Sequence, residues 1–273
     1  MPAFGAFQRP RTRQLPALGA NPAVKPAPFA YHAPASVEEA VRLLTTLEDA
    51  KVLAGGQSLV PLLNFRLARP AHLVDINGIP GLDRIYERDG GVALQALVRQ
   101  ADAEASELLR SRCPLVPEAL RHVAHAVIRN RGTVVGSIAH ADPAAELPAV
   151  LLALNGEVHV QGPRGVRDIP AADFFRGVLE SALEPDELAL EAWFPAFTGA
   201  HGIREESRRH GDYAMAGAVR AGDRLALFGV APTPVVADPH HPAKDIRPSG
   251  DLEATPEFRR HLVEVMTREL FAA

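Results

Sequence analysis

Two short glycine segments, far apart in the chain, constrain this protein more than any other feature. The first is Ala54–Ser58 (Ala-Gly-Gly-Gln-Ser), and about 80 residues later comes Thr133–Ser137 (Thr-Val-Val-Gly-Ser). Each segment lies where an apolar stretch ends and a helical pattern begins. A glycine turn at such a point lets backbone N–H groups approach an anion without a Cβ in the way. Two such turns predict a ligand with two phosphates held from both sides, which indicates a dinucleotide and redox chemistry.

The residues around the first segment predict a βαβ unit. Residues 51–54 have the composition of a short buried strand, and Ser58 is placed to cap a helix whose apolar face ends near Leu67. Residues 72–76 form the next apolar strand pattern. The anion site then lies where the helix begins. Neither glycine segment has the G-x-G-x-x-G or Walker spacing, so a nicotinamide-binding Rossmann fold is disfavoured.

Composition excludes several classes of function. The chain has 273 residues and a net charge of -4, with no basic pattern typical of nucleic-acid binding and no apolar run long enough to cross a bilayer. The single cysteine, Cys113, excludes a disulfide framework and a self-contained iron–sulfur or cysteine–zinc site, so we expect it to be a small buried apolar side chain. Residues 1–28 are rich in Pro and Arg, lack a secretory apolar region, and are interpreted as a flexible arm of a cytoplasmic protein.

The rest of the chain predicts an α+β fold. We expect hairpins at 84–95 and 157–169, helices around 101–109 and 117–125, a further strand at 188–194, and a domain junction at 195–202. Asp142 followed by Pro143 predicts a helix start, with the helix running to about Leu154. The predicted C-terminal domain has three antiparallel strands, at 203–207, 214–219 and 225–230, and a final helix that buries Phe258, Leu262, Val265, Met266 and Leu270.

Two polar groups leave alternatives open. His140 and Asp142 are candidates for a metal or acid–base pair, but no third ligand has a useful spacing, and a helix cap beside a loop histidine is favoured. The polar cluster Arg208–Asp212 is either a charged turn or a loop that meets the cofactor or a partner, since Gly211 allows a close backbone approach. The sequence predicts no catalytic side chain and no metal ligand.

From Phe29 to Leu270 the chain resembles the FAD-binding medium subunits of molybdenum hydroxylases, the carbon monoxide dehydrogenase and xanthine dehydrogenase group. The resemblance rests on seven segments: Ala-Gly-Gly-Gln-Ser-Leu at 54–59, Leu-Val-Asp-Ile at 73–76, Ile-Arg-Asn-Arg-Gly-Thr at 128–133, Gly-Ser-Ile-Ala-His-Ala-Asp-Pro-Ala-Ala-Glu-Leu-Pro at 136–148, Asp-Phe-Phe at 173–175, Arg-Arg-His-Gly-Asp-Tyr-Ala at 208–214 and Phe-Arg-Arg-His-Leu at 258–262.

The resemblance implies a PCMH-type FAD-binding domain over 29–198, in two α/β subdomains of about 29–80 and 81–198, followed by a flavoprotein C-terminal domain over 199–273. It implies that FAD is the cofactor and that both glycine segments hold its pyrophosphate, with Asp142 near the flavin side. The cofactor-binding residues implied in this way are Ala54, Gly55, Gly56, Gln57, Ser58, Leu59, Thr133, Val134, Val135, Gly136, Ser137 and Asp142.

The same resemblance implies two partners, a small subunit with [2Fe–2S] clusters and a large subunit with the molybdenum cofactor, in a dimer of heterotrimers. Electrons would pass from the clusters through FAD to an external acceptor. Three residues depart from the family pattern: Val135 and Gln95 stand where glycine is usual, and Ile203 stands where an aromatic residue is common. Val135 predicts backbone strain or a shifted phosphate, Gln95 predicts crowding of the adjacent turn, and Ile203 predicts the loss of one flavin-facing ring. Together they motivate the alternative that the chain is a degenerate assembly subunit with weak or no FAD. A free-standing flavin oxidase is disfavoured.

Overall fold

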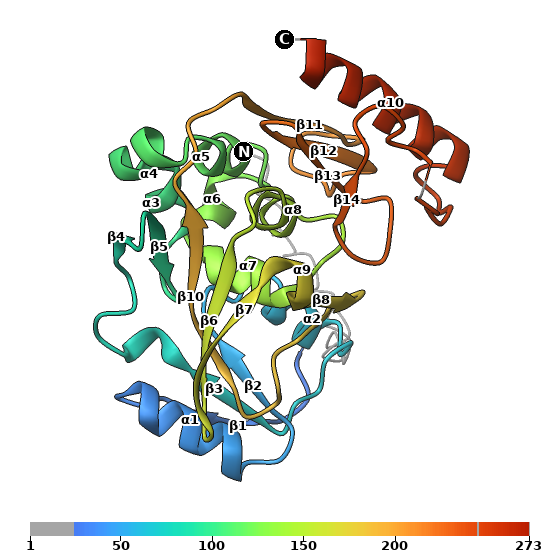
Figure 1. Ribbon diagram of the computed structural model, residues 1–273. Coiled ribbons are helices and arrows are strands. Elements are labelled where there is room, and N and C mark those ends of the chain that lie inside the picture. The colour runs from blue at the N-terminus through green and yellow to red at the C-terminus, as the bar shows by residue number, and fades with distance from the viewer. Residues whose placement is uncertain (1–24, 245, 273) are drawn as a thin grey trace, which may run out of the picture.

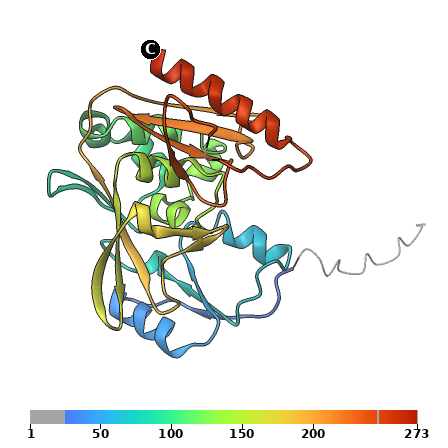
Figure 2. The same ribbon diagram turned by 45° about the vertical axis from the view of Figure 1, so that its right-hand side comes forward.

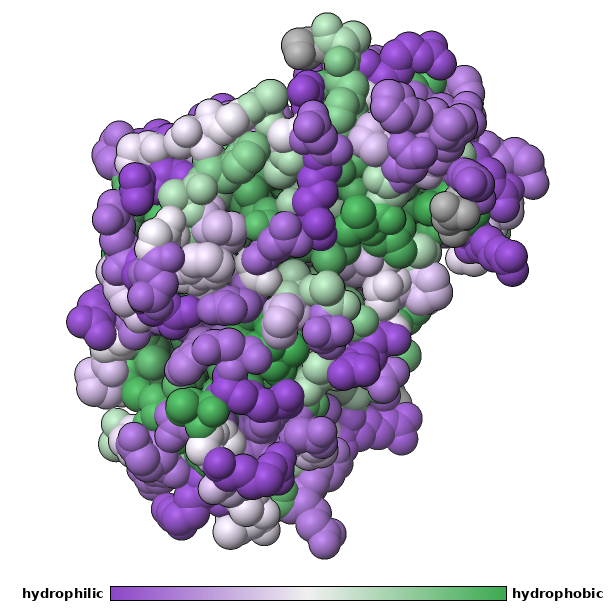
Figure 3. Space-filling view, viewed as in Figure 1, coloured by the Kyte–Doolittle hydropathy of each residue, from purple (hydrophilic) through white to green (hydrophobic). Residues whose placement is uncertain are grey.

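The computed structural model describes residues 25–244 and 246–272. Its helices and strands form three regions, which come one after another along the chain (Figure 1). The predicted arm covers residues 1–28, and residues 1–24 of it lie outside the described residues. Hydrophilic side chains cover most of the face in Figure 3, and hydrophobic side chains show through in separate patches. Within the described ranges, no helix is both long enough and apolar enough to cross a bilayer.

The N-terminal region is a three-stranded parallel sheet of order β1-β3-β2, covered by helix α1. Its elements are β1 (Ala30–His32), α1 (Val37–Thr46), β2 (Ala50–Leu53), α2 (Leu59–Asn64), β3 (His72–Asp75) and the 3-10 helix η1 (Ile76–Gly78). Val52 of β2 pairs with Val74 of β3, which confirms the predicted βαβ unit around the first glycine segment. At the start of α1, the Ser36 hydroxyl accepts a hydrogen bond from the backbone N–H of Glu39.

The middle region is a five-stranded antiparallel sheet of order β4-β5-β10-β6-β7, packed on a group of short helices. Its elements are β4 (Ile85–Arg88), β5 (Gly91–Gln95), α3 (Gln100–Ala105), α4 (Glu107–Arg112), α5 (Leu115–Leu120), α6 (Ala126–Arg129), α7 (Val134–His140), α8 (Glu146–Ala153), β6 (Glu157–Gly162), β7 (Gly165–Pro170), α9 (Ala171–Phe174), β8 (Phe175–Gly177), β9 (Glu180–Ser181) and β10 (Leu188–Pro195). Both predicted hairpins are present. Asp89 and Gly90 both have positive φ, as a two-residue hairpin turn requires.

The helices of the middle region start and end differently from the prediction. The first expected helix is divided at Ser106, which ends α3 and caps α4. The expected helix start at Asp142 is wrong, because the Asp142 carboxylate accepts from the N–H of Ala144 at 2.9 Å in a turn, and α8 begins only at Glu146. Cys113 is fully buried in this core, as expected, and burial raises the pKa of its thiol to about 12.

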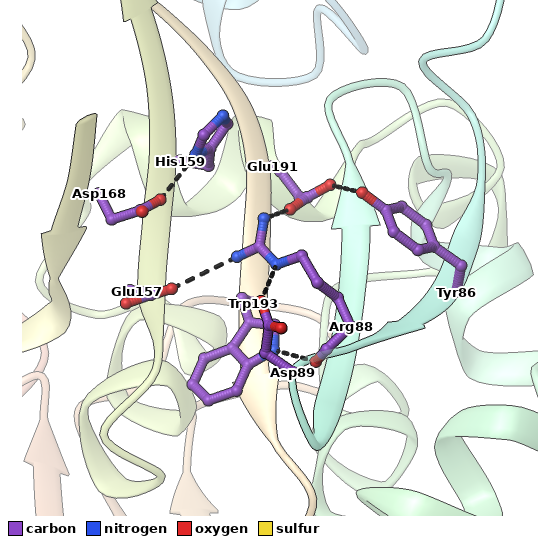
Figure 4. A network of polar contacts seen from close by, with 8 residues as sticks. All are labelled: Tyr86, Arg88, Asp89, Glu157, His159, Asp168, Glu191 and Trp193. Carbon is purple, nitrogen blue, oxygen red and sulfur yellow. Dashed lines mark hydrogen bonds and ion pairs between the residues drawn. The ribbon is translucent and has the colours of Figure 1, made fainter. Parts of the chain in front are cut away.

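A polar network covers the outer face of the five-stranded sheet (Figure 4). Glu191 of β10 is only 4% exposed, and it accepts from the Tyr86 hydroxyl and from the Arg88 guanidinium, both on β4. Arg88 also reaches Glu157 of β6 at 3.3 Å, and the Trp193 indole N–H donates to the backbone oxygen of Arg88 at 2.8 Å. Both oxygens of the buried Glu191 carboxylate are therefore paired, and the network links β4, β10 and β6.

The C-terminal region is an antiparallel sheet with helix α10 lying across it (Figure 2). Its elements are β11 (His201–Glu206), β12 (Ala216–Ala221), β13 (Arg224–Phe228), β14 (Val235–Ala237) and α10 (Pro256–Ala272). The three predicted strands are present, but β14 adds a fourth. The predicted inward face of α10 is wrong at Phe258, which is 44% exposed, whereas Arg259 is buried and donates to the backbone oxygens of Met215 and Gly229.

Candidate functional site

A large cavity of about 630 Å³ is lined by both glycine segments. Every residue implied by the family resemblance lines this cavity except Val134, whose side chain is fully buried in the core instead. Val134 lies in the first turn of α7, where consecutive side chains point to different sides of the helix. Its side chain therefore points into the core, while its neighbours line the cavity. The volume lies within the range of small-molecule sites.

The two glycine segments touch each other, although they are far apart in the sequence. A Cβ added to Gly55 would lie 2.8 Å from Cα of Gly132 and closer still to the backbone oxygen of Arg131. The second segment is fixed in place by two backbone hydrogen bonds. The N–H of Gln100, at the start of α3, donates to the Gly132 oxygen at 2.9 Å, and the N–H of Val134 donates at 3.1 Å to the oxygen of Val98, in the turn before α3. Gly55 is therefore required by this close approach.

Several backbone N–H groups of these segments are free to bind an anion. Among the described residues, the N–H groups of Gly56, Gln57, Ser58 and Val135 donate to no acceptor, whereas the N–H of Gly136 is capped by the Thr133 hydroxyl. Unpaired backbone donors need a partner, and concave groups of them are typical of phosphate sites. Donors from two segments on one cavity fit the two phosphates of a dinucleotide such as FAD.

The three departures from the family pattern do not obstruct this cavity. The expected strain at Val135 is wrong, because Val135 lies in α7, has no positive φ, and is 3% exposed. Gln95 does not line the cavity, and its side-chain oxygen accepts from the Arg84 N–H at 3.2 Å. Ile203 is fully buried in the core and does not line the cavity either.

One part of the cavity wall carries acidic and phenolic groups. Asp142, Glu146 and Tyr213 all line it. Glu146 is 8% exposed, and its pKa is raised to about 8 by burial and then by the nearby carboxylates of Glu205 and Asp142. Burial and the carboxylates of Asp142 and Glu146 raise the pKa of Tyr213, with an opposing contribution from the Ser58 hydroxyl. Burial lowers the pKa of His140, and Asp142 opposes this shift.

The loop before β12 forms another part of the cavity wall. The sequence left the role of this loop open. Gly211, Asp212 and Tyr213 line the cavity, which agrees with the interpretation of this segment as a loop that meets the ligand site and leaves it a prediction. Gly211 has φ +89°, and a Cβ there would lie 2.6 Å from the ring of His125. A side chain at this position would therefore push the loop away from α6.

Other lining residues carried no sequence signal for a ligand site. They are apolar or isolated polar residues whose role depends on tertiary packing: Lys51, Val52, Leu62, Ala68, Ile76, Ala96, Gln100, Val123, Ala124, Ile128, Leu179, Leu183, Glu187, Leu188 and Ala189. Glu146 differs from these residues, because it lies only four positions after Asp142 in the sequence and lines the same cavity. A second, smaller cavity of about 310 Å³ flanks the first segment and includes Asp75, Asn77 and Arg131.

Comparison with known proteins agrees with this geometry. Residues 27–197 match the family described as the FAD binding domain in molybdopterin dehydrogenase. The chain is 48% identical over 198 residues to the 6-hydroxypseudooxynicotine dehydrogenase complex subunit alpha of Paenarthrobacter nicotinovorans (71% of this chain, 67% of that protein). It is 42% identical over 220 residues to the carbon monoxide dehydrogenase medium chain of Hydrogenophaga pseudoflava (76% of this chain, 77% of that protein).

A solved structure extends the agreement to the whole fold. The carbon monoxide dehydrogenase of Hydrogenophaga pseudoflava, in a form that lacks the Mo-pyranopterin moiety of its molybdenum cofactor, superposes with a TM-score of 0.86 at 35% identity, covering 91% of this chain and 97% of that chain. The fold and the site thus define an FAD-binding oxidoreductase subunit. The chain belongs to the family of FAD-binding domains of molybdopterin dehydrogenases, of the carbon monoxide dehydrogenase and xanthine dehydrogenase type.

Proposed function

We propose that the chain is the FAD-binding electron-transfer subunit of a multi-subunit molybdenum hydroxylase. In this proposal a small partner subunit delivers electrons from its [2Fe–2S] clusters, a large partner subunit carries the molybdenum cofactor, and an external acceptor takes the electrons, in a dimer of heterotrimers. The observation that carries the proposal is the cavity between the two touching glycine segments, with free N–H groups from both.

The residues of the chain bind and orient the cofactor. We assign the FAD pyrophosphate to Ala54–Leu59 on one side and Thr133–Ser137 on the other, with Asp142 near the flavin side. When it is bound, FAD supplies the reversible electron chemistry, and the protein supplies position and electrostatics. The single buried cysteine supports a need for partners, because one thiol cannot ligate an iron–sulfur cluster.

The names of the relatives support the same assembly. One is a medium chain of carbon monoxide dehydrogenase, and another is the medium subunit of nicotine 6-hydroxylase. The alternative, an assembly subunit with weak or no FAD, rested on Val135, Gln95 and Ile203. Its basis is weakened because two of these residues lie away from the cavity and the third has ordinary helical geometry.

The cofactor is tested on the purified full-length chain. Heat or acid should release a flavin with the mass of FAD in a ratio near one per chain, because a single cavity joins both segments. Release of FMN, a covalent adduct, or a colourless protein that takes up no added FAD would overturn the assignment.

The assembly is tested by expressing the chain with candidate small and large subunits and purifying it through a tag on this chain. Iron and molybdenum should appear in the eluate, and the chain alone should show no hydroxylase activity, with slow flavin-dependent electron transfer at most. A chain that emerges without either metal, and that oxidises an aldehyde or purine unaided, would be a free-standing oxidase.

A further inference from the structure

A chain of side-chain hydrogen bonds links the two glycine segments. Asn77 of η1 donates from Nδ2 to the backbone oxygen of Ala54 at 2.8 Å. Arg99, which directly precedes α3, donates from Nη2 to Asn77 Oδ1 and from Nη1 to the backbone oxygen of Arg131, both at 2.7 Å. Neither Asn77 nor Arg99 lines the large cavity. The two side chains therefore form a bridge, outside the cavity wall, between segments that are far apart in the sequence.

The bridge ends at the point where the two segments touch. A Cβ on Gly55 would lie nearest to the backbone oxygen of Arg131, which is the oxygen that Arg99 holds. The same peptide unit is fixed at its other side, because the N–H of Gly132 donates to the Ile128 oxygen at 2.7 Å. A peptide unit is planar, so hydrogen bonds at its oxygen and at its N–H together restrict its rotation. The backbone that Gly55 touches is therefore held in one orientation.

Position 77 needs an amide, because the side chain donates on one side and accepts on the other. Its Nδ2 also donates to Asp75 Oδ1 at 2.6 Å, so both amide hydrogens meet an oxygen, and Oδ1 is left to accept from Arg99. Asp75 accepts further from the Asn77 backbone N–H at 2.9 Å and from the Tyr31 hydroxyl at 2.6 Å. Residues of β1 and β3 thus hold the amide in the orientation that joins Ala54 to Arg99.

Arg99 is attached to the second segment by its backbone and reaches the first through Asn77. The backbone of Arg99 pairs with Thr133, and the N–H of the next residue, Gln100, donates to the Gly132 oxygen. A planar guanidinium presents several N–H donors in a fixed fork, which a lysine ammonium does not reproduce. The fork is what allows one side chain to hold Asn77 and a backbone oxygen at the same time.

The bridge also brings two positive charges close to the glycine segments. Burial, and then the charge of Arg131, lower the pKa of Arg99. The carboxylates of Asp102 and Asp75 oppose this shift. Two guanidinium groups that repel each other beside the free N–H groups would be offset by a doubly charged pyrophosphate.

We infer that Asn77 and Arg99 are positioning residues for FAD, which set the spacing of the two segments that bind its pyrophosphate. The inference rests on the proposed function, because that proposal assigns the pyrophosphate to these segments. Asn77 holds the first segment at Ala54, Arg99 holds the second at Arg131, and each side chain orients the other. Loss of either residue should therefore disturb both segments, whereas a residue with a local structural role disturbs the segment that it touches.

The first experiment needs no FAD. Hydrogen exchange of the FAD-free full-length chain is followed by mass spectrometry in peptides that cover 54–62 and 128–137, both of which contain hydrogen-bonded N–H groups. Asn77→Ala should speed exchange about tenfold in 128–137, and Arg99→Ala should do so in 54–62. This effect on the opposite segment is the readout that a local structural role would not move. Faster exchange confined to the segment that each residue touches would overturn the bridge.

Arg220→Ala is the matched control. Arg220 also joins two backbone oxygens, those of Gly222 and Leu270, but it does so in the C-terminal region. Its replacement removes a guanidinium and two hydrogen bonds of the same kind, and exchange in both glycine segments should stay at the wild-type rate. Faster exchange there in Arg220→Ala would mean that the segments respond to any loss of stability, which would overturn the inference.

FAD titration of the same variants measures the consequence for the cofactor. Arg99→Ala should raise the Kd about 30-fold and Asn77→Ala about tenfold, because each removes hydrogen bonds that hold the segments. In the double variant the Kd should stay about 30-fold above wild type, instead of about 300-fold, because the second change breaks a bridge that is already broken. Arg99→Lys keeps the charge without the fork and should still bind about tenfold more weakly than wild type.

These outcomes separate the bridge from the proposed function. Circular dichroism verifies that each variant is folded, and Arg99→Lys carries the test if Arg99→Ala does not fold. Additive losses in the double variant, or wild-type affinity in Arg99→Lys, would overturn the bridge while FAD binding stands. A wild-type chain that binds no FAD would overturn the proposed function and, with it, the role of these residues in positioning FAD, while the exchange result still decides whether the bridge couples the two segments.

Discussion

The two glycine segments reach the same cavity with different backbone requirements. In the first segment, Gly56 has φ +73° and Gly55 lies directly against the backbone of the second segment. In the second, no residue has positive φ, and the only close neighbour of a Cβ on Gly136, among the described residues, is the Thr133 side chain. The first segment therefore needs glycine for its conformation and for a backbone contact, whereas the second tolerates Val135 because it is an ordinary helix start.

Gly55→Val should have the largest effect. The new side chain meets the backbone at Arg131 and Gly132, and backbone atoms cannot move aside as a side-chain end can. We expect FAD binding to weaken by about 100-fold or more, with a loss of about 3 kcal/mol in the free energy of unfolding. Gly78→Ala, where a Cβ meets nothing within 4 Å, is the control. FAD titration and urea unfolding measure both effects, and wild-type affinity in Gly55→Val would show that the segments need not touch.

Val135→Gly should destabilise the chain rather than relieve strain. It removes a side chain that is 3% exposed and places glycine in α7, which together should cost about 3 kcal/mol in urea unfolding. If Val135 were instead a strained replacement for glycine, the same change would tighten FAD binding by about 1 kcal/mol. Tighter FAD binding in Val135→Gly would support the strained replacement. Lower stability without a gain in FAD affinity would support an ordinary helix start.

Gly56→Val should have an intermediate effect. A β-branched residue at φ +73° costs about 2 kcal/mol, while the nearest atoms, on the Leu53 and Val60 side chains at 3.2 Å, can shift slightly. Flavin should be lost with little change in the circular dichroism spectrum. Gly56→Asn is the matched variant, since asparagine adopts this backbone conformation more readily, and it should retain more flavin. Equal flavin content in both variants would mean that conformation at Gly56 does not matter.

Gly136→Ala should have the smallest effect. The added Cβ displaces the Thr133 hydroxyl and costs about 1 kcal/mol of capping, while alanine regains about 1 kcal/mol of helix propensity. The net change in unfolding free energy should be under about 0.5 kcal/mol. In a Thr133→Ala background the cap is already absent, so Gly136→Ala should then stabilise α7 by about 1 kcal/mol. Destabilisation in both backgrounds would mean that this glycine is needed for close approach, like Gly55.

Local patterns were sufficient to predict the glycine segments and most of the strands. The β2–α2–β3 unit follows from an apolar run, a glycine turn and a helical pattern that are adjacent in the sequence. Strands β1 and β14 have three residues each, too few for alternation to be recognised. Asp142 and Pro143 are typical of a helix start, but Ala141 in the left-handed conformation ends α7 and leads the chain through an extra turn before Glu146.

The candidate site was predictable where its residues lie in recognisable local segments, as both glycine segments do. Tyr213, Leu188 and Lys51 reach the cavity because separate elements pack together, and no local pattern marks them as neighbours. The expectation for Val135 was wrong because a family preference for glycine was taken as a need for positive φ, whereas the backbone there is helical. The side chain of Val134 was expected at the cofactor, but helix geometry directs it into the core.

The loop at Gly211–Tyr213 has a consequence for how the holoprotein is made. These residues complete a cavity whose other walls come from segments between Lys51 and Ala189. During synthesis the ribosome releases the earlier walls first, and this last wall emerges only when more than three quarters of the chain has been made. Nascent chains shorter than this lack one wall of the cavity. The cavity is therefore complete only late in the synthesis of the polypeptide.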